Sequence, residues 1–236
     1  DFLVPVDDGV VVGVRLHIGA HGHPNILFFH GNGEIAADYD ELGPIYNRIG
    51  INFLAADYRG YGCSTGTPTI TAMMRDCHTI FSHVTEWLDR HGFQGPLIVM
   101  GRSLGSASAI ELAHAHPDRV SGLIIESGFA YVAPLLRRLG IDPAAVGFRD
   151  DEESTFRHIE KIVSWQKPLL VIHGEFDQII PFADGQALFD ACPSTRKHLL
   201  RIKGADHNNL FLHGLDDYLA AVGRLTSACS GLPQSS

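Results

Sequence analysis

Two Gly-x-Ser-x-Gly pentapeptides occur in this chain of 236 residues, and either could present a serine hydroxyl for nucleophilic attack. Gly101–Gly105 (GRSLG) directly follows the apolar run Leu97–Met100 and opens a segment rich in Ser and Ala, an order typical of a strand, tight turn and helix. Gly62–Gly66 (GCSTG) runs instead into a Thr-Pro pair, which is typical of a loop before a helix. We therefore expect Ser103 to be the nucleophile, with a helix N-cap as its structural alternative, and Ser64 to be a loop residue.

A serine hydroxyl needs a base that removes its proton, and the base needs a carboxylate that orients it. Asp177 follows the apolar run 168–173, and His207 follows the next apolar run. Because the carboxyl ends of parallel strands meet at one sheet edge, both side chains are expected beside Ser103. The order along the chain predicts a triad with His207 as base and Asp177 as its orienting acid. Glu126, which ends its own strand, is the alternative acid.

Acyl transfer also requires hydrogen-bond donors for the oxyanion of the tetrahedral intermediate. One is expected from the backbone amide of Leu104, because it follows the nucleophile. The second is expected in His30–Glu34 (HGNGE), which follows an apolar run and precedes a helix. We assign it to the backbone amide of Asn32, with Gly33 as the alternative and a plain Gly-rich turn as the structural explanation. Glu34 is unusual beside an anion site, and is expected either to face solvent or to disfavour anionic substrates.

Metal and cofactor chemistry have little support in the sequence. His21 with His23, and His114 with His116, lie neither in an HExxH motif nor beside an obvious third ligand. The four cysteines are far apart and form no CxxC pair, which argues against a zinc knuckle and favours a reducing compartment. We expect no metal and no cofactor.

The apolar runs before these groups alternate with helical patterns and predict an α/β fold with a mostly parallel sheet. The expected strands are Val10–Ile18, Asn25–His30, Ile51–Asp57, Leu97–Gly101, Val120–Glu126, Pro168–His173 and Lys197–Ile202. Only the first alternates clearly, which predicts an antiparallel edge strand. The best helix is Thr69–His91, whose apolar stripe, including Ile70 and Met73, is expected to be core. Similar stripes predict helices near 103–116, 183–191 and 211–225, before a tail from Ser227 without regular structure.

Composition restricts the partners. Hydrophobic residues make up 45% and charged residues 19%, as in globular proteins, and the net charge of −9 offers no extended attraction to nucleic acid. The apolar runs are much shorter than the roughly 20 residues that cross a bilayer. We expect a small-molecule substrate, no nucleic-acid partner and no membrane span, and the oligomeric state stays open.

Five segments in order resemble the α/β-hydrolase superfamily of serine hydrolases, over nearly the whole chain. They are HGN at His30–Asn32, DYRGYGxS at Asp57–Ser64, GRSLG at Gly101–Gly105, HGExD at His173–Asp177 and GxxH at Gly204–His207. The chain is most similar to the compact lysophospholipase, thioesterase and protein-depalmitoylase branch. The resemblance implies an α/β-hydrolase fold with an eight-stranded, mostly parallel sheet flanked by helices, a Ser103, Asp177 and His207 triad, and a structural role for the DYRGYG loop.

In such folds, specificity usually comes from an insertion after the sixth strand, here about 128–165. It is short, with one small helix expected around Leu135, Leu136 and Leu139 and another over 153–163. So small a cap leaves the site open, so we expect short-chain or exposed acyl esters. Phe129, Phe176 and Ile179, with Tyr131 and Phe148, are expected to line an apolar acyl pocket, with plain core as the alternative for each.

The sequence thus predicts a single α/β-hydrolase domain over 1–236 that cleaves a carboxylic ester or thioester through an acyl-enzyme on Ser103. The alternatives are a serine peptidase or amidase on the same triad, and a non-catalytic binding member of the fold. The expected location is the cytoplasm, although a chain that begins at Asp1 leaves an upstream signal or anchor open.

Overall fold

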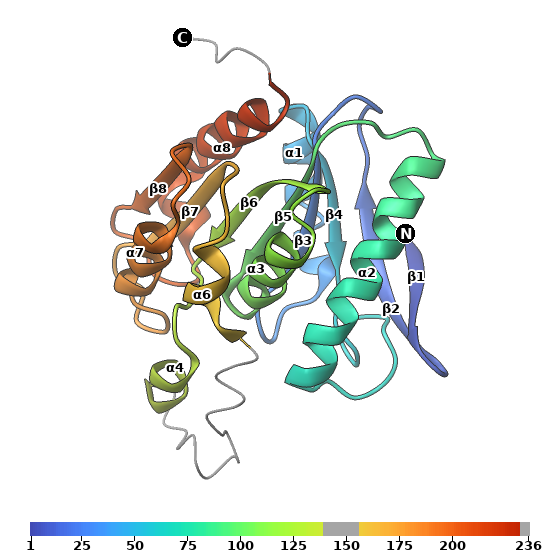
Figure 1. The fold of residues 1–236 in the computed structure, drawn as a ribbon, viewed down its shortest axis with the longest axis horizontal. Coiled ribbons are helices and arrows are strands. Elements are labelled where there is room, and N and C mark those ends of the chain that lie inside the picture. Colours follow the sequence, from blue (N-terminus) through green and yellow to red (C-terminus); the bar gives the residue numbers. More distant parts are fainter. Residues whose placement is uncertain (139–155, 232–236) are drawn as a thin grey trace.

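The computed structural model describes residues 1–138 and 156–231, in which helices cover both faces of an eight-stranded sheet (Figure 1). The strands are β1 (Phe2–Asp7), β2 (Val10–His17), β3 (Asn25–Phe29), β4 (Asn52–Ala56), β5 (Leu97–Arg102), β6 (Val120–Glu126), β7 (Leu169–Gly174) and β8 (Lys197–Ile202). The helices are α1 (Leu42–Arg48), α2 (Ile70–Arg90), α3 (Ser106–Ala115), α4 (Val132–Arg138), α6 (His158–Ile162), α7 (Phe182–Ala191) and α8 (Leu210–Cys229), with 3-10 turns η1 (Ala36–Tyr39) and η2 (Ser103–Gly105). The predicted strands are all present within one or two residues of their expected ends.

The sheet has the order β1-β2-β4-β3-β5-β6-β7-β8. β2 is antiparallel to both its neighbours, and every pairing from β4 to β8 is parallel. The antiparallel prediction for β2 is confirmed, but the prediction that β2 forms the edge is wrong, because β1 pairs with its outer side. A half-buried strand is recognised by alternating apolar and polar residues, and β1 lacks this alternation. Its outward-facing residues Leu3 and Pro5 are apolar, like its inward-facing residues Phe2, Val4 and Val6.

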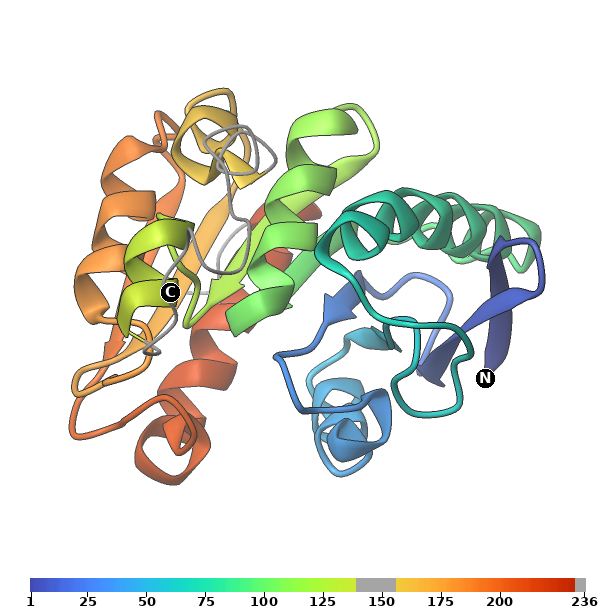
Figure 2. The ribbon, with the colours of Figure 1, turned by 90° about the horizontal axis from the view of Figure 1, so that it is seen from below.

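Each buried strand supplies side chains to two cores, because successive residues point to opposite faces of a sheet. In β3, Leu27 and Phe29 pack on the side of α2, α3 and α7, whereas Ile26 and Phe28 pack on the side of α1 and α8. Figure 2 shows these two helical layers on opposite sides of the sheet. Continuous apolar runs are therefore required in the central strands, as their sequences predicted.

Helices α2 and α8 form where they were expected, and one detail of each differs from the prediction. The side chain of Thr69 caps α2 by accepting a hydrogen bond from the amide of Ala72 at 3.1 Å, which explains the start of the helix. Ile70, predicted to be core, is 43% exposed. The prediction that regular structure ends at Ser227 is wrong, because α8 continues to Cys229 and the Ser227 hydroxyl donates to the carbonyl of Gly223 at 2.9 Å.

The cap segment is described only in part. α4 contains Leu135 and Leu136, where a helix was expected, and α6 occupies the later part of the second predicted helix. Leu139 and Phe148 lie outside the described residues.

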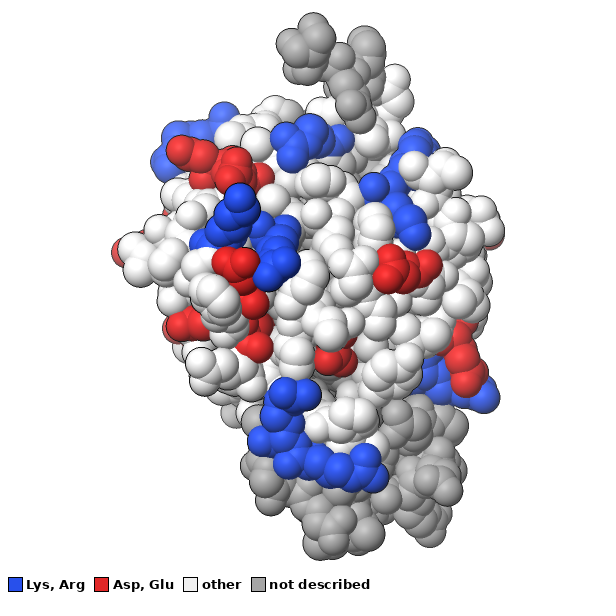
Figure 3. All heavy atoms as spheres, turned by 90° about the vertical axis from the view of Figure 1, so that its left-hand side faces the viewer, with Lys and Arg blue, Asp and Glu red and all other residues white. Residues whose placement is uncertain are grey.

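Over residues 1–138 and 156–231, no helix combines the length and apolarity needed to cross a membrane. The face at the β8 edge is mostly formed by uncharged residues, and it carries separate patches of Lys and Arg and of Asp and Glu side chains (Figure 3). One ion pair on β8 joins Arg201 to Glu175 at 2.9 Å.

Candidate active site

Ser103 lies on the tight turn between β5 and α3, in a backbone conformation that L residues rarely adopt, with φ of 51°. The two flanking glycines permit this turn. A Cβ on Gly101 would lie 2.1 Å from the carbonyl oxygen of Gly105, and a Cβ on Gly105 would lie 2.1 Å from the carbonyl oxygen of Phe29. The close contact of η2 with β3 and β5 therefore requires glycine at both positions, and it raises the Ser103 side chain from the sheet edge.

The structure brings Ser103, His207 and Asp177 together although more than 100 residues separate the first two. His207 Nε2 lies 3.0 Å from the Ser103 hydroxyl oxygen, and His207 Nδ1 lies 2.7 Å from Asp177 Oδ2. The loop after β7 carries Asp177, and the loop between β8 and α8 carries His207. Both histidine nitrogens are therefore in hydrogen-bond contact with groups suited to proton transfer and orientation.

Asp177 is held as an ionised group by its surroundings. Its Oδ1 accepts hydrogen bonds from the amides of Ile179 (3.0 Å) and Ile180 (2.8 Å), and its side chain is fully buried. Burial by itself would raise the pKa of Asp177, but hydrogen bonds from His173 and His207 and the interaction with His207 together lower it below its ordinary value. His173 Nε2 also donates to the carbonyl of Ile180 at 2.8 Å, so this strand-end histidine stiffens the Asp177 loop.

Ser64, the serine of the other pentapeptide, and Glu126, the alternative acid, make different contacts. The hydroxyl oxygen of Ser64 accepts a hydrogen bond from the amide of Gly13 at 3.0 Å, a contact that attaches the loop to β2. Glu126 is contacted by Arg102 (3.4 Å) and by the hydroxyl of Tyr218 (2.6 Å). Burial raises the pKa of Glu126, although Arg102 and Tyr218 oppose this. The acid in contact with the histidine is thus Asp177.

The two residues expected to supply the oxyanion hole, Asn32 and Leu104, line the same cavity. Leu104 is in the first turn after Ser103, where backbone N–H groups have no partner within the helix. Asn32 follows β3, and its side-chain oxygen accepts a hydrogen bond from the hydroxyl of Tyr61 at 2.8 Å. Asn32 and Leu104 line the same cavity of about 260 Å³, whereas Gly33 is not among its lining residues.

The three residues predicted to bind the acyl group do not line the cavity that contains Asn32 and Leu104. Phe129 is 1% exposed and packs in the core against Phe156 and His158. Phe176 is 61% exposed and Ile179 36% exposed, on the loop around Asp177. The 260 Å³ cavity is lined instead by the loop after β4 and the first half of α2, and none of these three residues belongs to its wall.

Arg102 is a residue of the site that the sequence analysis missed. Its guanidinium lies 3.2 Å from Glu34 and 3.4 Å from Glu126, and it donates to the carbonyl oxygen of His207 at 3.1 Å. Glu34 in turn accepts a hydrogen bond from the amide of Gly31 at 2.7 Å. Neither role expected for Glu34 describes this half-buried ion pair. The sequence shows only that each of the three charged residues follows or ends a strand, and the structure shows that these strands, β3, β5 and β6, are adjacent.

Two of the four histidines considered as metal ligands, His21 and His116, contact other side chains. His21 stacks on Phe93, and His116 Nε2 contacts His78 Nδ1 at 3.1 Å. Among the residues that the structure describes, no group of three or more His, Cys, Asp or Glu side chains is arranged to hold a metal ion.

The chain resembles proteins already known. The family model described as serine aminopeptidase, S33, matches residues 21–146, more than half of the chain. Human alpha/beta hydrolase domain-containing protein 17B is 31% identical over 214 residues, which are 86% of this chain and 66% of the relative. Mouse protein 17C is 30% identical over 197 residues, 80% of this chain and 55% of the relative. The chain therefore spans less than two thirds of the length of these curated relatives.

Solved structures share the fold at lower identity. The esterase Pf2001 of Pyrococcus furiosus has a TM-score of 0.75 and 18% identity, covering 95% of this chain and 90% of that one. The monoacylglycerol lipase of Paleococcus ferrophilus has a TM-score of 0.69 and 21% identity, covering 93% and 99%. With the family model, the relatives and the sheet order in agreement, the chain belongs to the α/β-hydrolase superfamily, in the family described as serine aminopeptidase, S33.

Proposed function

We propose that the protein is a serine hydrolase that cleaves a carboxylic ester or thioester through an acyl-enzyme on Ser103. The observation that carries the proposal is the continuous contact from the Ser103 hydroxyl through His207 to the buried Asp177 carboxylate, at 3.0 and 2.7 Å. A helix N-cap would not require the left-handed backbone of Ser103 or a histidine at its hydroxyl.

The first half-reaction forms the acyl-enzyme. Ser103 Oγ attacks the carbonyl carbon while its proton passes to His207 Nε2, and the carbonyl π electrons move onto oxygen. The amides of Asn32 and Leu104 donate hydrogen bonds to this oxyanion. When the carbonyl re-forms, the bond to the alcohol or thiol breaks, and the leaving group takes the proton from His207. The second half-reaction repeats these steps with water as nucleophile, and it releases a carboxylic acid and free Ser103.

Asp177 supports both half-reactions without giving or taking a proton. Because its pKa is lowered, it remains a carboxylate while His207 becomes an imidazolium, and its negative charge stabilises that cation. It also accepts the hydrogen bond from Nδ1, which leaves Nε2 unprotonated and able to act as the base.

The test compares the protein with Ser103→Ala and Ser64→Ala, since each serine is central to one of the two similar pentapeptides. We expect a fluorophosphonate probe to label the unaltered protein and Ser64→Ala, and p-nitrophenyl butyrate hydrolysis to fall by about 10³-fold or more only in Ser103→Ala. Equal labelling of all three proteins would refute the assignment of the nucleophile. Absence of labelling and turnover in all three would favour a binding role.

A peptidase is the second candidate, because the matching family model is described as a serine aminopeptidase. The same triad can attack an amide. A matched pair of p-nitrophenyl ester and p-nitroanilide substrates separates the two functions. We expect the ester to be the better substrate, and an anilide with a free amino group that exceeds the ester in kcat/KM would support the peptidase instead.

A further inference from the structure

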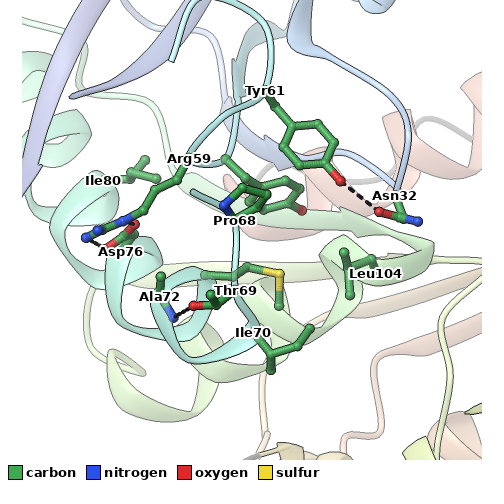
Figure 4. A pocket seen from close by; sticks show the side chains of 12 residues that line it. Asn32, Arg59, Tyr61, Pro68, Thr69, Ile70, Ala72, Asp76, Ile80 and Leu104 are labelled. Carbon is green, nitrogen blue, oxygen red and sulfur yellow. Dashed lines mark hydrogen bonds and ion pairs between the residues drawn. The ribbon is translucent and has the colours of Figure 1, made fainter. Parts of the chain in front are cut away.

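The cavity beside Asn32 and Leu104 extends from the candidate oxyanion hole to the first half of α2. Its wall consists of Asn32, Tyr58, Arg59, Tyr61, Pro68, Thr69, Ile70, Ala72, Met73, Asp76, Ile80 and Leu104. In Figure 4, Asn32 and Leu104 lie at one end, and Arg59, Asp76 and Ile80 lie at the other. Its volume of about 260 Å³ is close to the lower end for pockets that bind small molecules.

The inner wall of the cavity is apolar. Met73 is 6% exposed and Ile80 1% exposed, whereas Thr69 and Ile70 are exposed at the outer end of α2. The two charged side chains in the wall neutralise each other, since Arg59 forms an ion pair with Asp76 that includes a 2.8 Å hydrogen bond from Nη2 to Oδ1. The cavity thus offers buried hydrocarbon and a paired charge, which suits an apolar chain rather than a charged ligand.

The position of the cavity relates it to the reacting group. Leu104 is the residue after Ser103, so the wall of the cavity begins one residue from the candidate nucleophile. The α2 residues in the wall extend from position 70 to 80, and ten residues of α-helix rise about 15 Å. With C–C bonds of about 1.5 Å, an extended alkyl chain advances about 1.3 Å per carbon, so the wall is long enough for a chain of at most about twelve carbons.

We propose that this cavity is the acyl pocket, and that it takes an unbranched, medium-length acyl chain whose carbonyl carbon is at Ser103 and whose end lies near Ile80. The inference rests on the proposed serine hydrolase function. It replaces the expected pocket around Phe176 and Ile179, and it predicts a preference for decanoyl esters over acetyl and palmitoyl esters.

Two variants should change the chain-length preference in opposite directions. Ala72→Leu adds carbon atoms to the wall, and should reduce the ratio of kcat/KM for p-nitrophenyl decanoate to kcat/KM for p-nitrophenyl butyrate about tenfold or more. Met73→Ala enlarges the cavity and should move the optimum to longer chains. Thr71→Leu is the matched control, because Thr71 is exposed in the same turn and does not line the cavity. Thermal unfolding of each variant shows whether it is folded at the assay temperature.

A binding measurement tests the pocket independently of catalysis. In the Ser103→Ala background, decanoate should bind by calorimetry, Ala72→Leu should weaken that binding about tenfold or more, and Thr71→Leu should not. Unchanged decanoate binding and an unchanged chain-length optimum in Ala72→Leu would overturn the acyl pocket even if Ser103 is catalytic. A shift of the optimum by Ile179→Trp would overturn it in favour of the Asp177 side. The unaltered protein could instead hydrolyse no ester and still bind decanoate in a way that Ala72→Leu weakens. That result would refute the proposed function, and it would leave the cavity as a binding site for an acyl chain.

Discussion

At the scale of single residues, the ionised carboxylate of Asp177 affects both the proposed reaction and the stability of the folded protein. The amide of asparagine at this position could not stabilise the imidazolium of His207 and would hold it in the wrong tautomer. We expect Asp177→Asn to lower kcat by about 10⁴-fold with the fold retained. The measurement is kcat for p-nitrophenyl ester hydrolysis by the variant and the unaltered protein under the same conditions.

The same residue predicts a pH dependence of unfolding. The pKa of Asp177 lies below its ordinary value of 3.8 in the folded protein, so the unfolded chain takes up this proton first as the pH falls. Its contribution to stability is therefore complete above about pH 5 and is lost as the pH falls through and below the ordinary pKa. Urea unfolding at neutral pH and near pH 4 should show a smaller acid loss in Asp177→Asn than in the unaltered protein. The exposed Asp190 supplies a control, and an equal change in Asp190→Asn and Asp177→Asn would contradict the assignment.

At the scale of elements, the close packing of η2 against β3 determines where Ser103 lies. Gly105 has an ordinary φ of −63°, so alanine there is opposed only by the collision of its Cβ with the Phe29 and His30 carbonyl oxygens at 2.1 and 2.8 Å. Because these are backbone atoms, we expect Gly105→Ala to cost about 3 kcal/mol or more in the free energy of unfolding.

Gly223 in α8, unlike Gly105, has room for a side chain. A Cβ on Gly223 meets no atom within 4 Å, so Gly223→Ala should stabilise the protein by about 0.5–1 kcal/mol through helix propensity. Denaturant unfolding of both variants tests the pair. If Gly105→Ala were as stable as Gly223→Ala, the contact between η2 and β3 would not be the constraint that we infer.

At the scale of the whole molecule, Arg102 joins loops that follow three different strands. It contacts Glu34 after β3, Glu126 at the end of β6 and the carbonyl of His207 after β8. Arg102→Met would leave two carboxylates without their cation, and we expect a loss of about 3–5 kcal/mol in stability. Glu126→Gln in the same chain should recover part of that loss, because it removes one uncompensated charge.

A purely structural role would leave the reactivity of the folded variant unchanged. If Arg102 also holds the His207 loop in place, fluorophosphonate labelling of Ser103 should slow in Arg102→Met below its unfolding temperature, and Arg102→Lys should restore part of the rate. Normal labelling in folded Arg102→Met would limit Arg102 to stability.

Much of this architecture was predictable from local sequence. Buried parallel strands require continuous apolar runs, so the residues of β3 to β7 are visible in the sequence, and the chemistry-bearing residues follow them at the carboxyl ends. The Gly101 and Gly105 spacing predicts the turn at Ser103 for the same local reason, since only glycine fits two such close backbone contacts.

The edge strand, the Arg102 ion pairs and the cavity at α2 depended on tertiary structure. β1 is recognisable only through its pairing with β2, because its outward residues are as apolar as its inward ones. Arg102 reaches His207 across 105 residues of chain, and Met73 belongs to a core stripe and to the cavity wall at once. The hydrophobic periodicity of the sequence therefore determined where strands and helices form. It also determined at which edge of the sheet the polar residues after the strands are found. Which side chains meet there depended on strand order and packing, which are properties of residues far apart in the chain.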